Sequence, residues 1–126
     1  MLFRSASGKG SGADMEWKLL KELTQAWSVS GRERNVREII RREAEGFADE
    51  IRTDALGNLL CLKRGQDHPD KKVIMLSAHM DEIGCQVTKI EPDGRIRLCR
   101  VGWVWTASMY NDKVMFANGT IGVVGC

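Results

Sequence analysis

The sequence lacks a long hydrophobic run, a large net charge and any closely spaced pair of cysteines. No apolar stretch approaches the roughly 20 residues of a membrane-spanning helix, and the N-terminus has no signal-peptide core. The formal net charge is +2, with acidic residues interleaved among the basic ones, so no strongly basic surface is expected for nucleic acid or lipid. We therefore expect a cytoplasmic protein that binds neither nucleic acid nor a membrane.

The four cysteines, Cys61, Cys85, Cys99 and Cys126, form no C-x-x-C pair, which argues against a zinc ribbon. Cys61 and Cys99 lie in apolar runs typical of strands, where a free thiol behaves as a small hydrophobic side chain. A cytosolic protein also keeps its thiols reduced. We expect buried, unpaired cysteines rather than disulfides or metal ligands.

Helical periodicity is confined to the first part of the chain. Residues 1–13 have little apolar content and are interpreted as a disordered tail or an artefact. Leu19, Leu20 and Leu23 then recur at helical spacing and predict a helix over 14–26, capped by Asp14. A second helix with an apolar face and a charged face follows a capping box that begins at Ser30.

The rest of the chain shows the spacing and turn residues of strands. Strands are predicted at 50–53, 59–63, 73–78, 84–90, 95–101, 113–117 and 120–125. The turns between them include Glu91–Gly94 and the strong hairpin signal Asn118-Gly119. Residues 14–83 therefore predict an α/β domain, and 84–126 predict the start of an all-β module. A strand that runs up to Cys126 further suggests a truncated module.

The most informative stretch is His79-Met80-Asp81-Glu82, which follows the apolar run 73–78. A buried strand there would place these side chains at its carboxyl end, where open α/β sheets hold their ligand chemistry. Imidazole binds zinc or cobalt, and a nearby carboxylate can ligate as well or fix the tautomer of the ring. His79 is thus a candidate metal ligand and Asp81 a candidate catalytic residue. The spacing alone is a weak signal, because polar groups at a strand end more commonly bind backbone amides, and Glu82 is expected to be structural or to face solvent.

A two-metal hydrolase needs several carboxylates, a second histidine and a general base. The acids after Asp81 are Glu82, Glu91, Asp93 and Asp112, and none has a histidine beside it. His68 lies in a charged loop and is interpreted as solvated. A complete site is therefore not expected within these residues. Trp103 and Trp105 could line a pocket, although core or interface positions are the more common use of such residues.

Two motifs together carry a family resemblance. The sequence T-D-A-L-G-N at 53–58 is followed some twenty residues later by A-H-M-D-E-I-G at 78–84. With Val29-Ser30-Gly31 and the surrounding pattern, residues 16–126 resemble the M42 family of metallo-aminopeptidases. These are the tetrahedral aminopeptidases, which include glutamyl aminopeptidase and proteins labelled endoglucanase M.

The resemblance implies a zinc-peptidase αβα domain, with residues 14–83 as its first part. Residues 84–126 would begin the inserted β-barrel, PDZ-like domain that the family uses in assembly. It also implies two zinc or cobalt ions, peptide substrates, and homo-oligomers from dimers to dodecamers. His79 matches the first metal-ligand histidine of the family, and Asp81 matches the aspartate that supports it.

The other ligands of the family have no counterpart in the sequence. We therefore expect the N-terminal portion of an aminopeptidase, inactive by itself. The alternative is a non-catalytic module that assembles or binds by β-pairing through residues 84–126. The sequence does not reveal which N-terminal residue of a substrate would be preferred.

Overall fold

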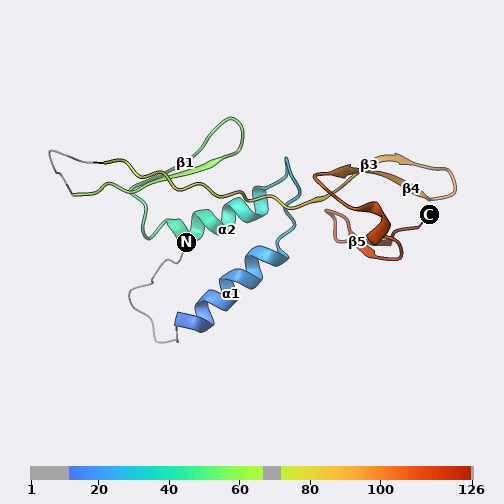
Figure 1. Cartoon of the computed structure of the whole chain (residues 1–126), viewed down its shortest axis with the longest axis horizontal. Coiled ribbons are helices and arrows are strands. Elements are labelled where there is room, and N and C mark those ends of the chain that lie inside the picture. The colour runs from blue at the N-terminus through green and yellow to red at the C-terminus, as the bar shows by residue number, and fades with distance from the viewer. Residues whose placement is uncertain (1–11, 67–71, 126) are drawn as a thin grey trace. The chain divides into compact units, whose positions relative to one another are not determined.

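The computed structural model describes residues 12–66 and 72–125 (Figure 1). Side chains are described from Glu16 onward. The elements are α1 (Gly12–Gln25), α2 (Arg34–Ala44), β1 (Glu50–Thr53), β2 (Leu59–Leu62), β3 (Gly84–Ile90), β4 (Ile96–Val101), the 3₁₀ helix η1 (Thr106–Ser108), β5 (Lys113–Met115) and β6 (Ile121–Val123). They form two compact units. The first contains α1, α2, β1 and β2, and the second contains Trp27–Glu33 and the chain from His79 onward. None of the helices in the described part of the chain is long and apolar enough to cross a bilayer.

Both predicted helices are present in the first unit. Leu19 and Leu23, one turn apart, are partly buried on α1, and Val36 on α2 is only 6% exposed. The start of α1 differs from the prediction, because the helix begins at Gly12 and Asp14 lies within its first turn. The spacing of apolar residues therefore predicted the helix but not its first residue, as is usual for helix ends.

The start of α2 departs from the predicted capping box. The helix begins at Arg34, and the Glu33 carboxylate accepts a hydrogen bond from the Gly31 amide. The Ser30 hydroxyl, which the capping box assigned to the helix, is donated to Asp81 instead. The prediction is wrong here because an ionised carboxylate from a distant segment competes for the hydroxyl, and a charge-assisted hydrogen bond is stronger than a neutral one.

Two arginines of α2 connect the elements of the first unit. Arg42 donates to both carboxylate oxygens of Glu22 on α1, at 2.9 and 2.8 Å, and its hydrogen bonds hold the pKa of Glu22 below its usual value. The pair is exposed, so its contribution to stability is small. Arg37 donates to the Gly57 carbonyl at 2.8 Å in a partly buried position, which fastens the β1–β2 turn to α2.

The predicted β1–β2 hairpin is confirmed as an antiparallel pair, with β2 one residue shorter than expected. Its turn is organised by the Asp54 carboxylate, which accepts from the amides of Leu56 and Asn58 at 3.0 and 2.8 Å. Gly57 adopts a positive φ of 90°, a conformation that glycine reaches without steric cost. The turn residues therefore fix this hairpin locally.

The strand predicted at 73–78 is wrong for the described residues. The segment, yellow in Figure 1, belongs to none of the three two-stranded sheets. Its apolar side chains face solvent, with exposed fractions of 96% for Val73, 84% for Ile74, 86% for Met75 and 64% for Leu76. An apolar run indicates a preference for burial, but a strand also requires a hydrogen-bonded neighbour, and none is present here.

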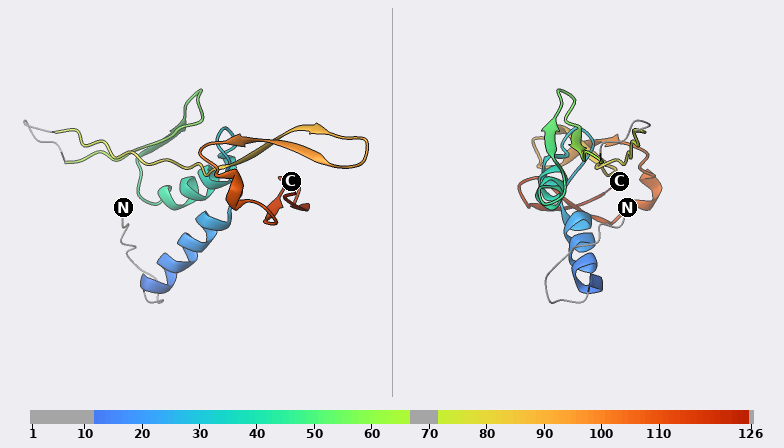
Figure 2. Two further views of the ribbon diagram at one scale, coloured as in Figure 1. Left: turned by 45° about the vertical axis from the view of Figure 1, so that its right-hand side comes forward. Right: turned by 90° about the vertical axis from the view of Figure 1, so that its left-hand side faces the viewer.

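The second unit contains the antiparallel β3–β4 hairpin, drawn as a long ribbon in Figure 2. The pairing extends from Gly84, opposite Val101, to the turn, where the Glu91 amide donates to the Arg95 carbonyl at 2.8 Å. The predicted range for β3 is confirmed, and β4 begins one residue later than expected. The turn signal therefore located this hairpin correctly.

The β5–β6 hairpin is also present, with strands shorter than predicted. The Phe116 amide donates to the Thr120 carbonyl at 2.9 Å, and the Gly119 amide donates to the Phe116 carbonyl at 2.8 Å. Gly119 has a φ of 83°, as expected for the glycine of an Asn-Gly turn.

The prediction of buried cysteines is wrong for two of the three described thiols. Cys61, Cys85 and Cys99 are free thiols, but Cys61 and Cys99 are exposed and only Cys85 is partly covered. A two-stranded sheet shields few of its own side chains, and Val36 and Val104 are the only buried hydrophobic residues in the described ranges. Cys126, His68 and residues 1–11 of the predicted tail lie outside the described residues.

Candidate metal-ligand site

The candidate site lies where two segments that are distant in sequence meet within the second unit. Val29 and Glu82 form a parallel β-bridge, and the Glu82 amide donates to the Ser28 carbonyl at 2.9 Å. The Ser28 amide in turn donates to a carboxylate oxygen of Glu82 at 3.3 Å. Glu82 is thus exposed and hydrogen-bonded to Ser28, in line with the expectation that it is structural or faces solvent. We call the contact of Ser28–Ser30 with Met80–Gly84 the site junction.

Two small residues allow the backbones of the site junction to approach each other. Ser28 is only 2% exposed, and its hydroxyl donates to the Met80 carbonyl at 3.0 Å. A Cβ atom on Gly84 would lie 2.6 Å from Cγ2 of Val29, closer than atoms can pack without displacement. Serine and glycine at these positions thus fix the path of the chain on either side of Asp81.

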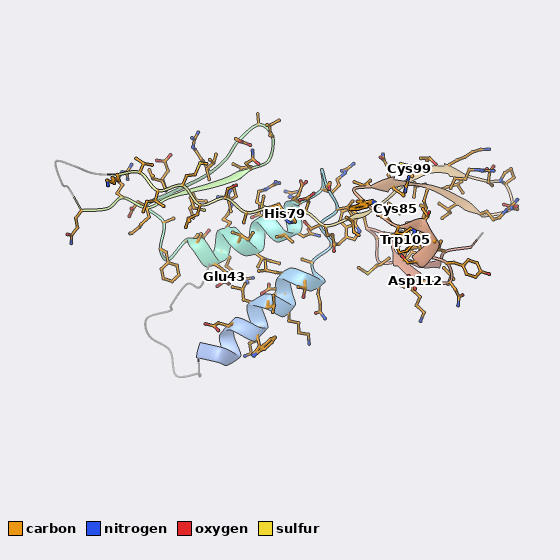
Figure 3. All side chains as sticks on the ribbon, viewed as in Figure 1. Glu43, His79, Cys85, Cys99, Trp105 and Asp112 are labelled. Carbon is orange, nitrogen blue, oxygen red and sulfur yellow. The ribbon has the colours of Figure 1, made fainter. Side chains whose placement is uncertain are left out.

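His79 lies on the extended chain that leads into β3 and is labelled in Figure 3. Its Nδ1 atom is 2.9 Å from the backbone carbonyl oxygen of Asp81 and 3.0 Å from Oδ1 of the same residue. Both partners are acceptors, so Nδ1 carries the hydrogen and the lone pair of the neutral ring is on Nε2. The imidazole is 85% exposed, which leaves Nε2 accessible.

Asp81 is held by a second hydrogen bond from across the site junction. The Ser30 hydroxyl donates to Oδ2 of Asp81 at 2.5 Å, while Oδ1 accepts from His79. These bonds, with Ser30 as the larger cause and His79 next, hold the pKa of the Asp81 carboxyl below its usual value. The carboxylate is therefore ionised at neutral pH and remains an acceptor on both of its oxygens.

This arrangement fits one ligand of a metal site. Ligand histidines commonly donate their other ring N–H to a carboxylate or a backbone carbonyl, as His79 does with Asp81. Residues 12–66 and 72–125 contain no group of three or more His, Cys, Asp or Glu side chains that could hold an ion. The described chain thus provides one oriented imidazole, and no catalytic step can be derived from it alone.

The sequence identified His79 and Asp81 but missed the contributions of Ser28 and Ser30. The structure brings these serines to residues 51 to 54 positions away in the sequence, and no local pattern reports such a contact. The sequence pattern assigns Ser30 only to the capping box of the second helix and gives Ser28 no role. The pattern that could have indicated this contact is a single apolar residue between two serines. Such a segment can place both hydroxyls on one face while its backbone forms a β-bridge.

The two tryptophans after β4 do not lie in a core. Trp103 is 93% exposed and Trp105 is 74% exposed, whereas Val104 between them is 6% exposed. The chain bends at Gly102 and Trp103, where the Val104 amide donates to the Gly102 carbonyl at 3.1 Å, and in this bend the valine is buried while both indoles are exposed. Together they line a hollow of about 460 Å³. This hollow contains neither His79 nor Asp81, so it is separate from the candidate ligand.

Comparison with solved structures defines the class of fold. A TET aminopeptidase from a marine sediment Thaumarchaeota archaeon superimposes with a TM-score of 0.79 at 30% identity, covering 91% of this chain and 32% of that one. The dodecamer PhTET1-12s superimposes with a TM-score of 0.70 at 36% identity, covering 86% and 33%. The chain therefore has an α/β fold similar to that of the TET aminopeptidases, as the sequence predicted.

Sequence comparison gives the family. A protein of Acetivibrio thermocellus named "Putative aminopeptidase" is 43% identical over 106 residues, covering 84% of this chain and 31% of its own length. The lysyl aminopeptidase of Pyrococcus furiosus is 31% identical over 115 residues, covering 88% and 32%. The sequence model of M42 glutamyl aminopeptidase matches residues 57–126, which include His79 and Asp81. The chain belongs to the M42 glutamyl aminopeptidase family, and it spans about a third of the length of the relatives it matches.

Proposed function

We propose that this chain is part of a cytoplasmic metallo-aminopeptidase that removes N-terminal residues from peptides, and that His79 is one of its metal ligands. The observation that supports the proposal is the His79–Asp81 pair, in which Nδ1 is bound by Asp81 and Nε2 is exposed. The family membership supplies the reaction class. The remaining ligands would come from residues outside the described ranges.

In this proposal each residue of the pair has a defined task. His79 binds through Nε2, and Asp81 orients the ring and stabilises the charge that the imidazole acquires on binding. A pair of zinc or cobalt ions, when bound, supplies an activated water and a Lewis acid for the scissile peptide carbonyl. Both oxygens of the Asp81 carboxylate accept hydrogen bonds, one from Ser30 and one from His79, so the proton transfers of the reaction are not assigned to Asp81.

The finer architecture and the assembly are also proposals. Residues 84–126 would begin the β-barrel, PDZ-like domain, and the chain would take part in a homo-oligomer. The β3–β4 and β5–β6 hairpins in the second unit support the first point. The similarity to a chain that forms a dodecamer supports the second point. A contribution of this domain to assembly would give its exposed strand edges hydrogen-bonded partners.

A chimera tests the enzymatic proposal. The chain would replace the matching third of the Pyrococcus furiosus lysyl aminopeptidase, and the product would be assayed with zinc or cobalt on a lysyl chromogenic amide. We expect turnover in the chimera, a fall to background for His79→Ala, and a loss of about 10–100-fold for Asp81→Asn. His68→Ala is the matched control and should retain full turnover. Equal activity of the His79→Ala and parent chimeras would contradict the assignment.

The second candidate is the non-catalytic module that assembles by β-pairing. The unpaired edges of the short sheets in the described residues favour it, as do exposed apolar strand residues such as Ile90 and Val123. Under this hypothesis the isolated chain oligomerises, whereas His79→Ala changes neither its size nor its binding. Light scattering of the isolated chain at several concentrations tests β-pairing, since a monomer at high concentration contradicts it. The turnover of the chimera then separates the candidates, because a non-catalytic module would give none.

A further inference from the structure

We propose that Ser30 is a positioning residue that sets the tautomer of His79 through Asp81. The proposal rests on the proposed function insofar as His79 binds a metal through Nε2. It adds that the preference for the Nδ1–H tautomer, which keeps Nε2 free, depends on a hydroxyl supplied by a segment 51 residues away.

The geometry assigns one task to each oxygen of the Asp81 carboxylate. Oδ2 accepts from the Ser30 hydroxyl at 2.5 Å, and Oδ1 faces Nδ1 of His79 at 3.0 Å. The Asp81 side chain is 37% exposed, so water competes for it and the His79 contact alone does not fix its orientation. The bond from Ser30 holds the carboxylate in the orientation in which Oδ1 faces the imidazole ring.

The consequence for the ring follows from its own exposure. The imidazole is 85% exposed, so neighbouring side chains do not pack it into one state. Its tautomer is set by the hydrogen-bond partners of Nδ1, and both of these acceptors belong to Asp81. When the carboxylate is free to turn toward water, Nδ1–H loses one of its two acceptors, and the Nε2–H tautomer gains population. That tautomer has no lone pair on Nε2 for a cation.

Ser28 provides a matched control in the same segment. Its hydroxyl donates to the Met80 carbonyl at 3.0 Å, whereas the hydroxyl that donates to the Asp81 carboxylate is that of Ser30. Ser28→Ala and Ser30→Ala therefore remove the same group from the same segment, two residues apart. A general loosening of the site junction would affect His79 in both variants, whereas positioning through Asp81 predicts an effect only in Ser30→Ala.

The test is two-bond ¹H–¹⁵N NMR of the histidine rings in the metal-free 126-residue chain. The spectra would be recorded near pH 8.5, well above the ordinary histidine pKa of about 6.5. His68→Gln assigns the second ring. We expect the wild type and Ser28→Ala to show Nδ1 as the protonated nitrogen of His79. In Ser30→Ala the ratio of Nδ1–H to Nε2–H should fall about fivefold, and Ser30→Thr, which retains a hydroxyl, should restore it.

The same ratio in Ser30→Ala and wild type, or an equal fall in Ser28→Ala, would overturn the proposal. A titration with Zn²⁺ alone then separates it from the proposed function. If Ser30 positions a ligand, Zn²⁺ perturbs Nε2 of His79 in the wild type and requires about tenfold more zinc in Ser30→Ala. If Zn²⁺ leaves Nε2 of the wild type unchanged, this chain alone does not bind zinc. The His79→Ala chimera then decides the metal assignment, while the tautomer ratios still decide the role of Ser30.

Discussion

The β3–β4 hairpin and the site junction use similar backbone contacts within one unit, but they differ in how far apart their partners are in sequence. In the hairpin, Ile90 faces Ile96 across the tight turn Glu91–Gly94. In the site junction, every bond joins residues 51 to 54 positions apart. Closing a longer loop costs more conformational entropy, although the cost grows slowly with length.

The difference shows what each region requires from its residues. A hairpin requires turn residues with suitable backbone angles, because its strands then meet without further help. The site junction requires that two chains approach closely after the rest of the unit has brought them together. Its important residues are therefore the small ones, Ser28 and Gly84, which no turn rule would identify.

The largest expected effect comes from filling the space of the site junction. In Gly84→Ala the new methyl group would lie 2.6 Å from Cγ2 and 3.0 Å from Cγ1 of Val29. Because valine is stiff at χ1, the backbone must move, and we expect a loss of about 2 kcal/mol in the free energy of unfolding. Urea denaturation measures the loss. Hydrogen exchange should accelerate at the Glu82 amide, which is bonded to Ser28.

A double mutant separates this overlap from other effects of the alanine. Val29→Ala removes both Cγ atoms, so Gly84→Ala should cost much less in that background than in the wild type. The loss of unfolding free energy in the double mutant should be about 1 kcal/mol smaller than the sum of the two single losses. Strictly additive losses would contradict the close approach of Val29 and Gly84 as the cause.

The same contrast explains how much of the fold the sequence predicted. The hairpins closed by Asp54–Asn58, Glu91–Gly94 and Asn118-Gly119 were located to within a few residues, because the turn signals act over a few positions. The segment 73–78 was placed in a strand on apolar content alone. Apolar content shows that burial is favoured but does not supply the neighbouring strand, and the segment is exposed in the described structure.

In the candidate site too, contacts between residues close in sequence could be predicted and contacts between distant residues could not. The pairing of His79 with Asp81 could be predicted because the two residues are two positions apart, and the structure places their side chains 3.0 Å apart. The bond from Ser30 to Asp81 could not be predicted, because the capping-box pattern formed with Glu33 already explains why a serine is at position 30. Choosing between the helix amide and the Asp81 carboxylate requires knowing that Asp81 lies nearby, which only the tertiary structure provides.

A hairpin substitution should have a smaller and more local effect. In Gly119→Ala the residue must adopt a φ of 83° in the β5–β6 turn, which costs a residue with a Cβ atom about 1 kcal/mol. Hydrogen exchange should accelerate at the Phe116 and Gly119 amides, both bonded within the turn. The Glu82 amide of the site junction should keep its protection. Equal acceleration at Glu82 would show that the hairpin and the site junction open together.

The smallest expected effect is a pH dependence of the β3–β4 hairpin. Arg97 and then Lys89 donate to the Glu91 carboxylate and hold its pKa below the usual value. A lowered folded-state pKa means that the stabilisation is complete above the unfolded pKa of about 4.3. The stabilisation is then lost as the pH falls through the folded-state pKa. Glu91→Gln should therefore reduce the urea midpoint at pH 6, and its difference from the wild type should shrink as the pH falls through the folded-state pKa.

Removing the main partner of Glu91 tests the cause of this pH dependence. Arg97→Gln leaves the carboxylate in place but removes the largest contribution to its lowered pKa, so its stability curve should be flatter than that of the wild type between pH 6 and 3. The site junction shares no bond with Glu91, and the exchange of the Glu82 amide relative to the global rate should not change. Parallel curves for the wild type and Glu91→Gln across this range would show that the turn ion pairs contribute nothing to stability, and that the hairpin depends on its turn conformation alone.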